Sequence, residues 1–370
     1  MKYYIIAGEA SGDLHASNLI KELKIIDQKA VFRCWGGDLM KAQGCDLIKH
    51  YNELDYMGFV EVFFNIRTIL QNIKFCKTDI LSFKPDALIL VDYPGFNLRI
   101  AEFAKKAGIK VFYYISPQVW AWKQGRVKKI KKAVDRMFVI LPFEKDFYKR
   151  FNYDVDFVGH PLLDSIANFE ANSNNELFFK EHQLDKRPLI AILPGSRKQE
   201  VKKMLPVMLA VTKFFPEYQF VIAGVSSLTI EFYNKLSDNK KINVIFGKTY
   251  QLLSNAKAAI VTSGTATLET ALFEVPEVVC YKGSSISFAL AKRLVNIKYI
   301  SLVNLIMDKE VVKELIQDDF NVKSLKDELF RILNNQKKDE ITLEYRELKK
   351  LLGNSGASIR TAKLILHDII

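Results

Sequence analysis

The chain lacks the features that mark membrane-spanning and disulfide-stapled proteins. No run reaches the roughly 18 uncharged apolar residues that a membrane-spanning helix needs. The 370 residues include only four cysteines, which show neither CxxC spacing nor a histidine at metal-ligand spacing, so we expect reduced and mostly buried thiols. The apolar opening, Met1 to Ala7, is too short for a secretion signal and predicts a first strand. These absences predict a cytoplasmic protein.

Signatures of the commonest nucleotide sites are also missing. The stretch Gly8 to Asp13 has the wrong spacing for GxGxxG and carries acids, which disfavours a dinucleotide dehydrogenase. The chain has no Walker A motif, which disfavours ATP hydrolysis. One Asp-x-Asp pair, Asp154 and Asp156, has no glycine-rich cradle, and we interpret it as the start of a strand. We therefore expect neither a metal ion nor another cofactor.

Positive charge is in excess, because 54 Lys and Arg residues face 42 Asp and Glu residues, a net charge of +12. This excess predicts an anionic partner. Much of it lies in the run Lys123 to Lys132, directly after Val119-Trp120-Ala121-Trp122. No zinc-finger, RRM or helix-turn-helix signature accompanies the run, so nucleic acid is not an expected partner. An anionic membrane surface fits it, and a solvated helix face is the plain alternative.

Apolar runs alternate with helical patterns along both halves of the chain, as buried parallel strands and their crossover helices do. The polar stretch 168–175 is the best linker candidate, and the pattern after Asp308 is helical. We predict an α/β fold of two doubly wound, Rossmann-like αβα domains that face a cleft. The expected strands cover residues 3–7, 87–91, 110–115, 137–141, 189–193, 220–223, 243–246, 258–261 and 277–280.

Two turns in the second half carry the strongest functional signal. Leu193-Pro194-Gly195-Ser196-Arg197 and Ser263-Gly264-Thr265-Ala266-Thr267-Leu268-Glu269 each follow a strand-like run and open a helical pattern. The unpaired N–H groups and the dipole at a helix start favour an anion. Arg197 adds a guanidinium suited to a diphosphate, and Glu269 suits ribose hydroxyls. Ordinary capping is the alternative for each turn. The pair favours a nucleotide-diphosphate site.

Two places in the first half supply candidate bases near the ends of predicted strands. Asp92 follows the apolar run Leu88 to Val91, and partial burial there raises a carboxyl pKa toward the range of a general base. Asp before a Pro-Gly turn is also a common turn initiator, which is the structural alternative. Glu9 and His15 follow the first strand and are less clear candidates.

The stretch Met57 to Leu70 is apolar over most of a helical circumference, a wider stripe than one core contact requires. Burial between a sheet and a neighbouring helix is one explanation. Together with the basic run, the stretch favours a membrane-docking surface. Its apolar contacts would be Phe59, Val62, Phe63 and Ile66.

Besides the two turns, the motifs Gly8-Glu9-Ala10-Ser11-Gly12-Asp13, Ser116-Pro117-Gln118-Val119-Trp120-Ala121-Trp122, Leu141-Pro142-Phe143-Glu144 and Gly159-His160-Pro161 stand along the chain. Together these motifs resemble the lipid-A-disaccharide synthase family, and the likeness runs nearly end to end, closing with Gly353-Asn354-Ser355-Gly356-Ala357-Ser358. The Ser-Gly-Thr turn alone also suits other glycosyltransferases.

The resemblance implies a GT-B fold whose last helices cross back onto the first domain. Residues 1–167 with 343–370 would bind the acceptor and dock to the membrane, and residues 168–342 would bind the UDP-sugar. The implied reaction is an inverting, metal-free transfer from UDP-2,3-diacylglucosamine to 2,3-diacylglucosamine 1-phosphate. Its products would be the β-1,6-linked disaccharide 1-phosphate and UDP.

The resemblance also implies roles for individual residues. Asp92 becomes the preferred base for the acceptor 6-hydroxyl and Glu9 a second essential acid. Val303 stands where the family usually shows Pro, which makes the placement of Asn304 less secure than that of Arg197. The implied substrate-binding residues are Arg197, Gly195, Ser196, Ser263, Gly264, Thr265, Thr267, Glu269, Asn304, Ser11, Gly12, Asp13 and Gln118.

Two other functions stay open at this point. The first is a UDP-sugar epimerase or hydrolase on the same fold, which needs no second sugar. The second is a basic nucleic-acid or membrane-binding module, whose binding would be salt-sensitive and which UDP would not stabilise. If the chain is the glycosyltransferase that the resemblance implies, we expect a peripheral protein on the inner face of the inner membrane. A further expectation is a homodimer that exchanges its C-terminal tails.

Overall fold

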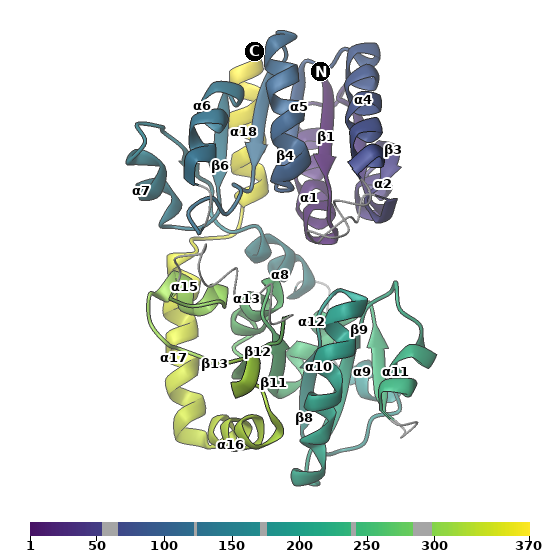
Figure 1. Ribbon diagram of the computed structural model, residues 1–370, viewed down its shortest axis with the longest axis vertical. Helices are drawn as coiled ribbons and strands as arrows, with labels where there is room; N and C mark the ends of the chain where they lie inside the picture. The colour runs from purple at the N-terminus through teal and green to yellow at the C-terminus, as the bar shows by residue number, and fades with distance from the viewer. Residues whose placement is uncertain (54–65, 122–123, 171–175, 238–241, 284–297) are drawn as a thin grey trace. The chain divides into compact units, whose positions relative to one another are not determined.

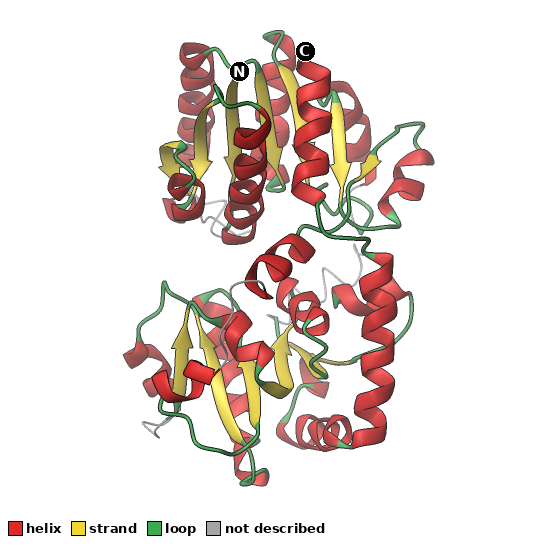
Figure 2. Ribbon diagram, turned by 180° about the vertical axis from the view of Figure 1, so that it is seen from behind, coloured by secondary structure: helices red, strands yellow, loops and turns green. Residues whose placement is uncertain are grey.

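The computed structural model describes residues 1–53, 66–121, 124–170, 176–237, 242–283 and 298–370. The chain forms two compact units, one made of Met1–Ser165 with Leu352–Ile370 and the other of Ile166–Leu351. Each unit is a parallel sheet with helices on both faces (Figure 1, Figure 2). The predicted α/β fold of two doubly wound domains is therefore confirmed.

The first unit has seven parallel strands in the order β3-β2-β1-β4-β5-β6-β7, so the direction of winding reverses between β1 and β4. The strands are β1 Lys2–Ala7, β2 Val31–Gly36, β3 Asp46–His50, β4 Ala87–Val91, β5 Lys110–Tyr114, β6 Arg136–Val139 and β7 Asp156–Phe157. The helices are α1 Ala10–Ile26, α2 Asp38–Ala42, η1 Tyr51–Glu53, α4 Ile66–Phe83, α5 Pro94–Lys106, η2 Gln124–Arg126, α6 Val127–Ala133, α7 Glu144–Lys149 and α18 Ala357–Ile369. Helix α8, Leu162–Glu170, begins in this unit and ends in the second.

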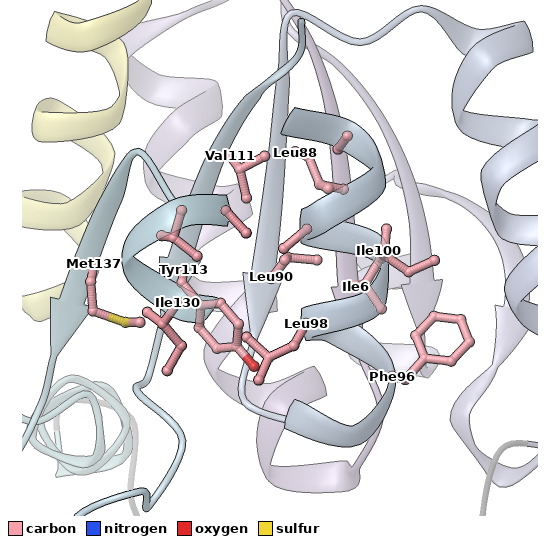
Figure 3. Close-up of a cluster of buried hydrophobic side chains, with 14 of the residues drawn as sticks. Ile6, Leu88, Leu90, Phe96, Leu98, Ile100, Val111, Tyr113, Ile130 and Met137 are labelled. Carbon is pink, nitrogen blue, oxygen red and sulfur yellow. The ribbon is translucent and has the colours of Figure 1, made fainter. Parts of the chain in front are cut away.

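The central strands of this unit are buried on both faces. Every residue of β4 is fully buried, because α4, α5 and α6 cover one face of the sheet and α1 and α18 cover the other. Figure 3 shows Leu98 and Ile100 of α5 against Leu88 and Leu90 of β4, with Tyr113 of β5 beside them. Such two-sided burial explains the unbroken apolar runs in the sequence. It also gives a rigid support for the residues that follow the strands.

The C-terminal helix α18 belongs to the first unit, where it packs against α1 and β5. The carboxylate of Asp164 on α8 accepts hydrogen bonds from the backbone N–H groups of Gly356, Ala357 and Ser358, the last two at 3.2 and 2.9 Å. An acid at a helix start satisfies unpaired N–H groups and complements the dipole. The predicted return of the last helix to the first domain is confirmed.

The second unit has six parallel strands in the order β10-β9-β8-β11-β12-β13, and its winding reverses between β8 and β11. The strands are β8 Leu189–Leu193, β9 Gln219–Gly224, β10 Asn243–Phe246, β11 Ala256–Thr262, β12 Glu277–Tyr281 and β13 Lys313–Ile316. The helices are α9 Glu176–Glu181, α10 Lys198–Ala210, η3 Thr212–Phe214, α11 Ile230–Leu236, α12 Thr249–Ser254, α13 Thr265–Leu272, α15 Leu302–Met307, η4 Gln317–Asp319, α16 Val322–Leu333 and α17 Asn335–Leu351.

Two predictions about the chain's organisation need correction. The region after Asp308 is not wholly helical, because β13 pairs with β12 at the edge of the second sheet. The predicted linker 168–175 begins too early, since α8 continues to Glu170, and its remainder lies outside the described residues. All four cysteines are free and buried, as predicted. Across the described ranges, no helix combines the length and apolar character that crossing a membrane requires.

Candidate active site

The first pair of candidate residues lies where the winding of the first sheet reverses. Ala7 at the end of β1 is in register with Val91 at the end of β4, so Glu9 and Asp92 leave the sheet on neighbouring strands. Ligands of doubly wound folds bind in the crevice at this reversal point. The topology therefore brings together two acids that are far apart in the sequence.

Asp92 has an unusual backbone conformation that its neighbours hold in place. Its φ is 43° and that of Tyr93 is 50°, so two consecutive residues lie in the left-handed region. The Asp92 carbonyl accepts hydrogen bonds from the Tyr113 hydroxyl at 2.5 Å and from Asn97 Nδ2 at 2.7 Å. Asn97 is fully buried at the start of α5. Such strain persists where surrounding contacts enforce it, and it gathers at functional sites.

The electrostatic environment of Asp92 suits a proton acceptor near neutral pH. Burial, and to a smaller extent the nearby Glu9 carboxylate, raises the pKa of the Asp92 carboxyl to about 7, and a hydrogen bond from the Tyr93 N–H opposes this rise. A base whose pKa lies near the working pH is the most effective general base. Glu9 occupies the N-cap position of α1, with extended backbone.

The structure gives Asp13 a role that the sequence analysis did not predict. Its buried carboxylate accepts the backbone N–H groups of Gly37, Leu39 and Met40 at 2.8 to 3.1 Å and so caps the start of α2. Asp13 thus has a structural role at the start of α2, and its role as a substrate contact stays a prediction. Gly12 is buried as well, with Ala7 behind it, whereas Ser11 in the first turn of α1 is half-buried.

His15, the third candidate base, is buried on α1. Burial lowers its pKa to about 4, against the opposing effect of Asp164, the carboxylate that caps α18. Its Nδ1 has no hydrogen-bond partner among the described residues. A neutral imidazole packed beside the docking site of α18 is a poor proton acceptor at neutral pH, so Asp92 is the stronger candidate.

Another buried carboxyl, Glu144, has no role predicted from the sequence. It accepts the N–H groups of Ile140 and Leu141 at 3.2 and 2.9 Å, just after β6, and burial raises its pKa to about 7. Ser116, which follows β5, shares a hydrogen bond of 2.7 Å with the Tyr148 hydroxyl. Gln118 in the same loop is exposed. The sequence feature that could have identified Glu144 is its position after a buried strand.

The two predicted phosphate turns lie on neighbouring strands of the second sheet. Leu193 at the end of β8 is in register with Val261 of β11, so the turns into α10 and α13 leave the sheet side by side. This is the reversal point of the second sheet. Each unit therefore places its candidate residues at its own reversal point.

The first turn is shaped by Gly195, whose φ of 116° lies in the left-handed region. A Cβ there would come within 2.8 Å of Glu200 Oε2. The same Oε2 accepts the Ser196 N–H at 3.2 Å, and Arg197 Nη1 lies 3.5 Å from Glu200 Oε1. The side chain of Arg197 is 44% exposed. The turn thus presents a guanidinium and backbone donors that solvent can reach.

The second turn leaves the start of α13 without a side-chain cap. The Ser263 hydroxyl donates to the carbonyl of Ile300 at 3.0 Å instead, and buried Thr267 donates to the carbonyl of Gly264 at 2.8 Å. Gly264 and Thr265 are exposed. The capping explanation for Ser263 is therefore wrong, and a helix start without a side-chain cap is a type of position that favours an anion.

Glu269 and Asn304 differ in what they can offer a ligand. Half-buried Glu269 accepts the Tyr250 hydroxyl at 2.9 Å, and burial raises its pKa. Asn304 is fully buried, and its amide donates to Val312 O and Glu314 Oε1 and accepts the N–H groups of Val311 and Val312, all at 2.8 to 3.0 Å. The Asn304 amide thus makes hydrogen bonds within the second unit, and its contact with UDP stays a prediction.

The proposed docking residues are only partly described. Phe59, Val62, Phe63 and Lys123 lie outside the described residues, whereas Ile66 begins α4 and is 53% exposed. In α6 the apolar positions Val127 and Ile130 are buried and the lysines are exposed. The basic run is therefore an exposed helix face over that part.

The Asp-x-Asp pair has a structural role. Asp156 begins β7 and pairs with Arg136 Nε at 2.7 Å, as the interpretation of a strand start predicts. Within the described part of the chain, no three His, Cys, Asp or Glu side chains gather in a way that would hold a metal ion.

Comparison with solved structures identifies the type of fold. The UDP-GlcNAc 2-epimerase from Methanocaldococcus jannaschii in complex with UDP-GlcNAc and UDP has a TM-score of 0.66 at 15% identity and covers 99% of this chain and 100% of its own. The calicheamicin glycosyltransferase CalG4 has a TM-score of 0.61 at 14% identity, covering 99% and 97%. At these identities the likeness shows the fold, which is of the predicted GT-B type.

Sequence comparison reaches further. The lipid-A-disaccharide synthase of Syntrophus aciditrophicus is 40% identical over 371 residues, covering 98% of this chain and 96% of the relative. That of Trichlorobacter lovleyi is 39% identical over 376 residues, covering 99% and 97%. A family model described as lipid-A-disaccharide synthetase matches residues 3–367. The chain therefore belongs to the lipid-A-disaccharide synthetase family.

Proposed function

We propose that this protein joins UDP-2,3-diacylglucosamine to 2,3-diacylglucosamine 1-phosphate, forming the β-1,6-linked disaccharide 1-phosphate and UDP with inversion at the anomeric carbon. Family membership supports the coarser statement, that the chain is a glycosyltransferase of lipid A disaccharide formation. The observation that carries the proposed mechanism is Asp92, strained at a reversal point, with a pKa raised to about 7.

Asp92 is the proposed general base. In an inverting transfer, the acceptor 6-hydroxyl attacks the anomeric carbon from the face opposite the diphosphate, and its proton must pass to a base. Because Tyr113 and Asn97 hold the Asp92 carbonyl, the backbone that carries the carboxylate is fixed relative to the sheet. We assign Glu9 a second role at the same edge, where its charge helps to keep the Asp92 pKa near 7.

The two turns of the second unit are the proposed diphosphate site. Arg197 and the backbone N–H groups around Gly195 and Gly264 would neutralise the departing UDP, because preorganised donors stabilise charge that develops in the transition state. Glu269, held by Tyr250, is proposed to accept from the ribose hydroxyls. Asn304 then has an indirect part, since its amide ties α15 to the start of β13.

Both proposed substrates carry acyl chains, so the protein must meet a lipid surface, and the exposed apolar and basic residues of the first unit could bind it. The start of α4 at Ile66 and the lysine face of α6 are proposed to meet an anionic membrane surface from the cytoplasmic side. Such docking would let the protein collect diacylated sugars without extracting them fully into water. Vesicle sedimentation with and without anionic lipid tests this part separately from catalysis.

A two-substrate assay tests the proposed reaction. Purified protein is incubated with both acylated sugars, and the products are separated by thin-layer chromatography and identified by mass spectrometry and by the anomeric coupling in the NMR spectrum. We expect a β-linked disaccharide 1-phosphate and one UDP per linkage formed, with and without EDTA. An epimerase or hydrolase would instead turn over the UDP-sugar when the acceptor is omitted, and an α-linked product would contradict inversion.

A further inference from the structure

We infer that Glu200 is a resident anion of the first phosphate turn, which occupies the groups that bind the diphosphate and must leave them when UDP binds. The inference rests on the proposed function, because it concerns the same turn. In this role Glu200 lowers the affinity for UDP and so speeds the release of this product.

The contacts of Glu200 cover the whole turn. Its Oε2 accepts the Ser196 N–H at 3.2 Å, and its Oε1 lies 3.5 Å from Arg197 Nη1. The space that a Cβ on Gly195 would take is filled by Glu200 Oε2 and Cβ, at 2.8 and 2.9 Å. One carboxylate thus contacts Ser196 and Arg197 and lies against the side of Gly195 where a Cβ would stand.

A carboxylate and a phosphate compete for such a place because both accept from N–H donors and both carry negative charge. Two anions cannot share the same donors at contact distance, since like charges repel strongly where solvent is partly excluded. The side chain of Glu200 is 36% exposed, so a change of rotamer moves its carboxylate into water. Binding of UDP is then an exchange of one anion for another.

The second turn provides an internal contrast. No acidic residue lies in the first turn of α13, and its N-cap residue, Gly264, makes no side-chain cap. The first turn of α10 does contain an acid, Glu200, three residues beyond its N-cap residue Arg197. Of these two neighbouring helix starts, one is open and the other is filled by its own chain.

Simple helix capping is the competing explanation, because Glu at this position often reaches back to a backbone N–H near the N-cap. The two explanations differ in their predictions. A cap stabilises the turn, so its removal leaves UDP affinity unchanged or weakens it. A resident anion competes with UDP, so its removal strengthens UDP affinity.

Isothermal titration of UDP into the full chain decides between them. The variants are Glu200→Gln, which keeps an acceptor for the Ser196 N–H but removes the charge, and Glu200→Ala, which removes both. The matched control is Glu231→Gln, which removes an exposed carboxylate from the first turn of α11. We expect UDP to bind about tenfold more tightly to Glu200→Ala, which corresponds to about 1.4 kcal/mol. Glu200→Gln should show a smaller gain and Glu231→Gln none.

Inhibition of turnover by UDP should strengthen in the same order. Unchanged or weaker UDP binding in both Glu200 variants would overturn the inference while leaving the proposed function intact. Thermal melting checks that each variant is folded, and Glu200→Gln remains informative if Glu200→Ala unfolds. If the wild-type chain itself binds no UDP, the proposed function fails first.

Discussion

The two reversal points present opposite kinds of site. In the first unit the key acid is half-buried, strained and tied down, because the Asp92 carbonyl accepts from both Tyr113 and Asn97. In the second unit the turns at Gly195 and Gly264 are open to solvent, and their donors are main-chain N–H groups and Arg197. Burial shifts a pKa and fixes an orientation, whereas exposure lets a ligand come and go. We therefore propose that the same topology serves proton transfer in one unit and exchange of an anion in the other.

Replacing Asp92 should have the largest effect and should separate the two sites. Asp92→Asn should lower turnover by roughly two to four powers of ten, the usual contribution of a general base, while UDP affinity stays unchanged. The fold should tolerate the change, because Asn adopts left-handed backbone conformations readily. Steady-state kinetics and UDP titration measure the two effects. Asp38→Asn, at a carboxylate that is 89% exposed, is the control. Near wild-type turnover in Asp92→Asn would remove this residue from the role of base.

Replacing Arg197 should affect the second site alone. A charge-assisted hydrogen bond contributes about 1.5–3 kcal/mol, so Arg197→Ala should weaken UDP binding by roughly 10- to 100-fold. Arg197→Lys should recover only part of this, because an ammonium does not reproduce the planar guanidinium fork. Lys202→Ala removes an exposed charge from the same helix and serves as the control. Equal UDP affinity in Arg197→Ala and Lys202→Ala would place the diphosphate elsewhere.

The pH dependence of turnover and of UDP binding should also distinguish the two sites. Since the Asp92 pKa is raised to about 7, kcat/KM should fall about tenfold for each pH unit below 7 as the base becomes protonated. Glu9 contributes to this raised pKa, so Glu9→Gln should move the inflection to lower pH, whatever rate remains. UDP affinity, measured by titration, should not follow the same curve. An inflection that stays in place in Glu9→Gln would contradict the proposed coupling of the two acids.

The same shift has a consequence for stability, with a defined sign. A carboxyl whose pKa is higher in the folded than in the unfolded chain binds its proton more tightly when folded. The free energy of unfolding should therefore fall as the pH rises from about 4 to about 7, and Asp92→Asn should lose this contribution. Denaturant titrations of both proteins at pH 5 and pH 8 measure the difference.

The glycines of the two phosphate turns, Gly195 and Gly264, should give the smallest and most selective effects. Gly195→Ala meets both a positive φ and Glu200, so it should lower the free energy of unfolding by about 1–3 kcal/mol. Gly264 has extended backbone and nothing within 4 Å of an added Cβ, so Gly264→Ala should change stability by less than about 0.5 kcal/mol. Its Cβ would nevertheless obstruct the approach of a diphosphate. Loss of UDP affinity without loss of stability in Gly264→Ala would locate the ligand at this turn.

The sequence predicted the central strands well and the outer ones poorly. Leu189–Leu193 and Ala87–Val91 are unbroken apolar runs because helices cover both faces of their sheets. By contrast, Val31–Gly36, Asp46–His50 and Lys313–Ile316 carry charges, since they lie nearer an edge where some side chains meet solvent. Short polar strands of this kind do not show the apolar period that identifies a buried one.

For the candidate site, the sequence indicated which residues stand at strand ends but not how their side chains are used. The Asp13 carboxylate finds its partners at Gly37 to Met40, and the Asn304 amide finds its partners at Val311 to Glu314. Such commitments depend on which strands and helices become neighbours, and no local pattern states this. Glu200 was missed for the same reason, because an acid in a first helical turn is ordinary until its contacts are known.

The docking of α18 onto α1 also sets an order for folding during synthesis. One face of α1, which ends at Ile26, stays uncovered until α18, which begins at Ala357, has left the ribosome. At about 5–20 residues per second, that interval is on the order of 20–60 s. The second unit, a single continuous stretch from Ile166 to Leu351, is complete before the first. A nascent chain should therefore hold a finished second unit while the first unit still awaits its final helix.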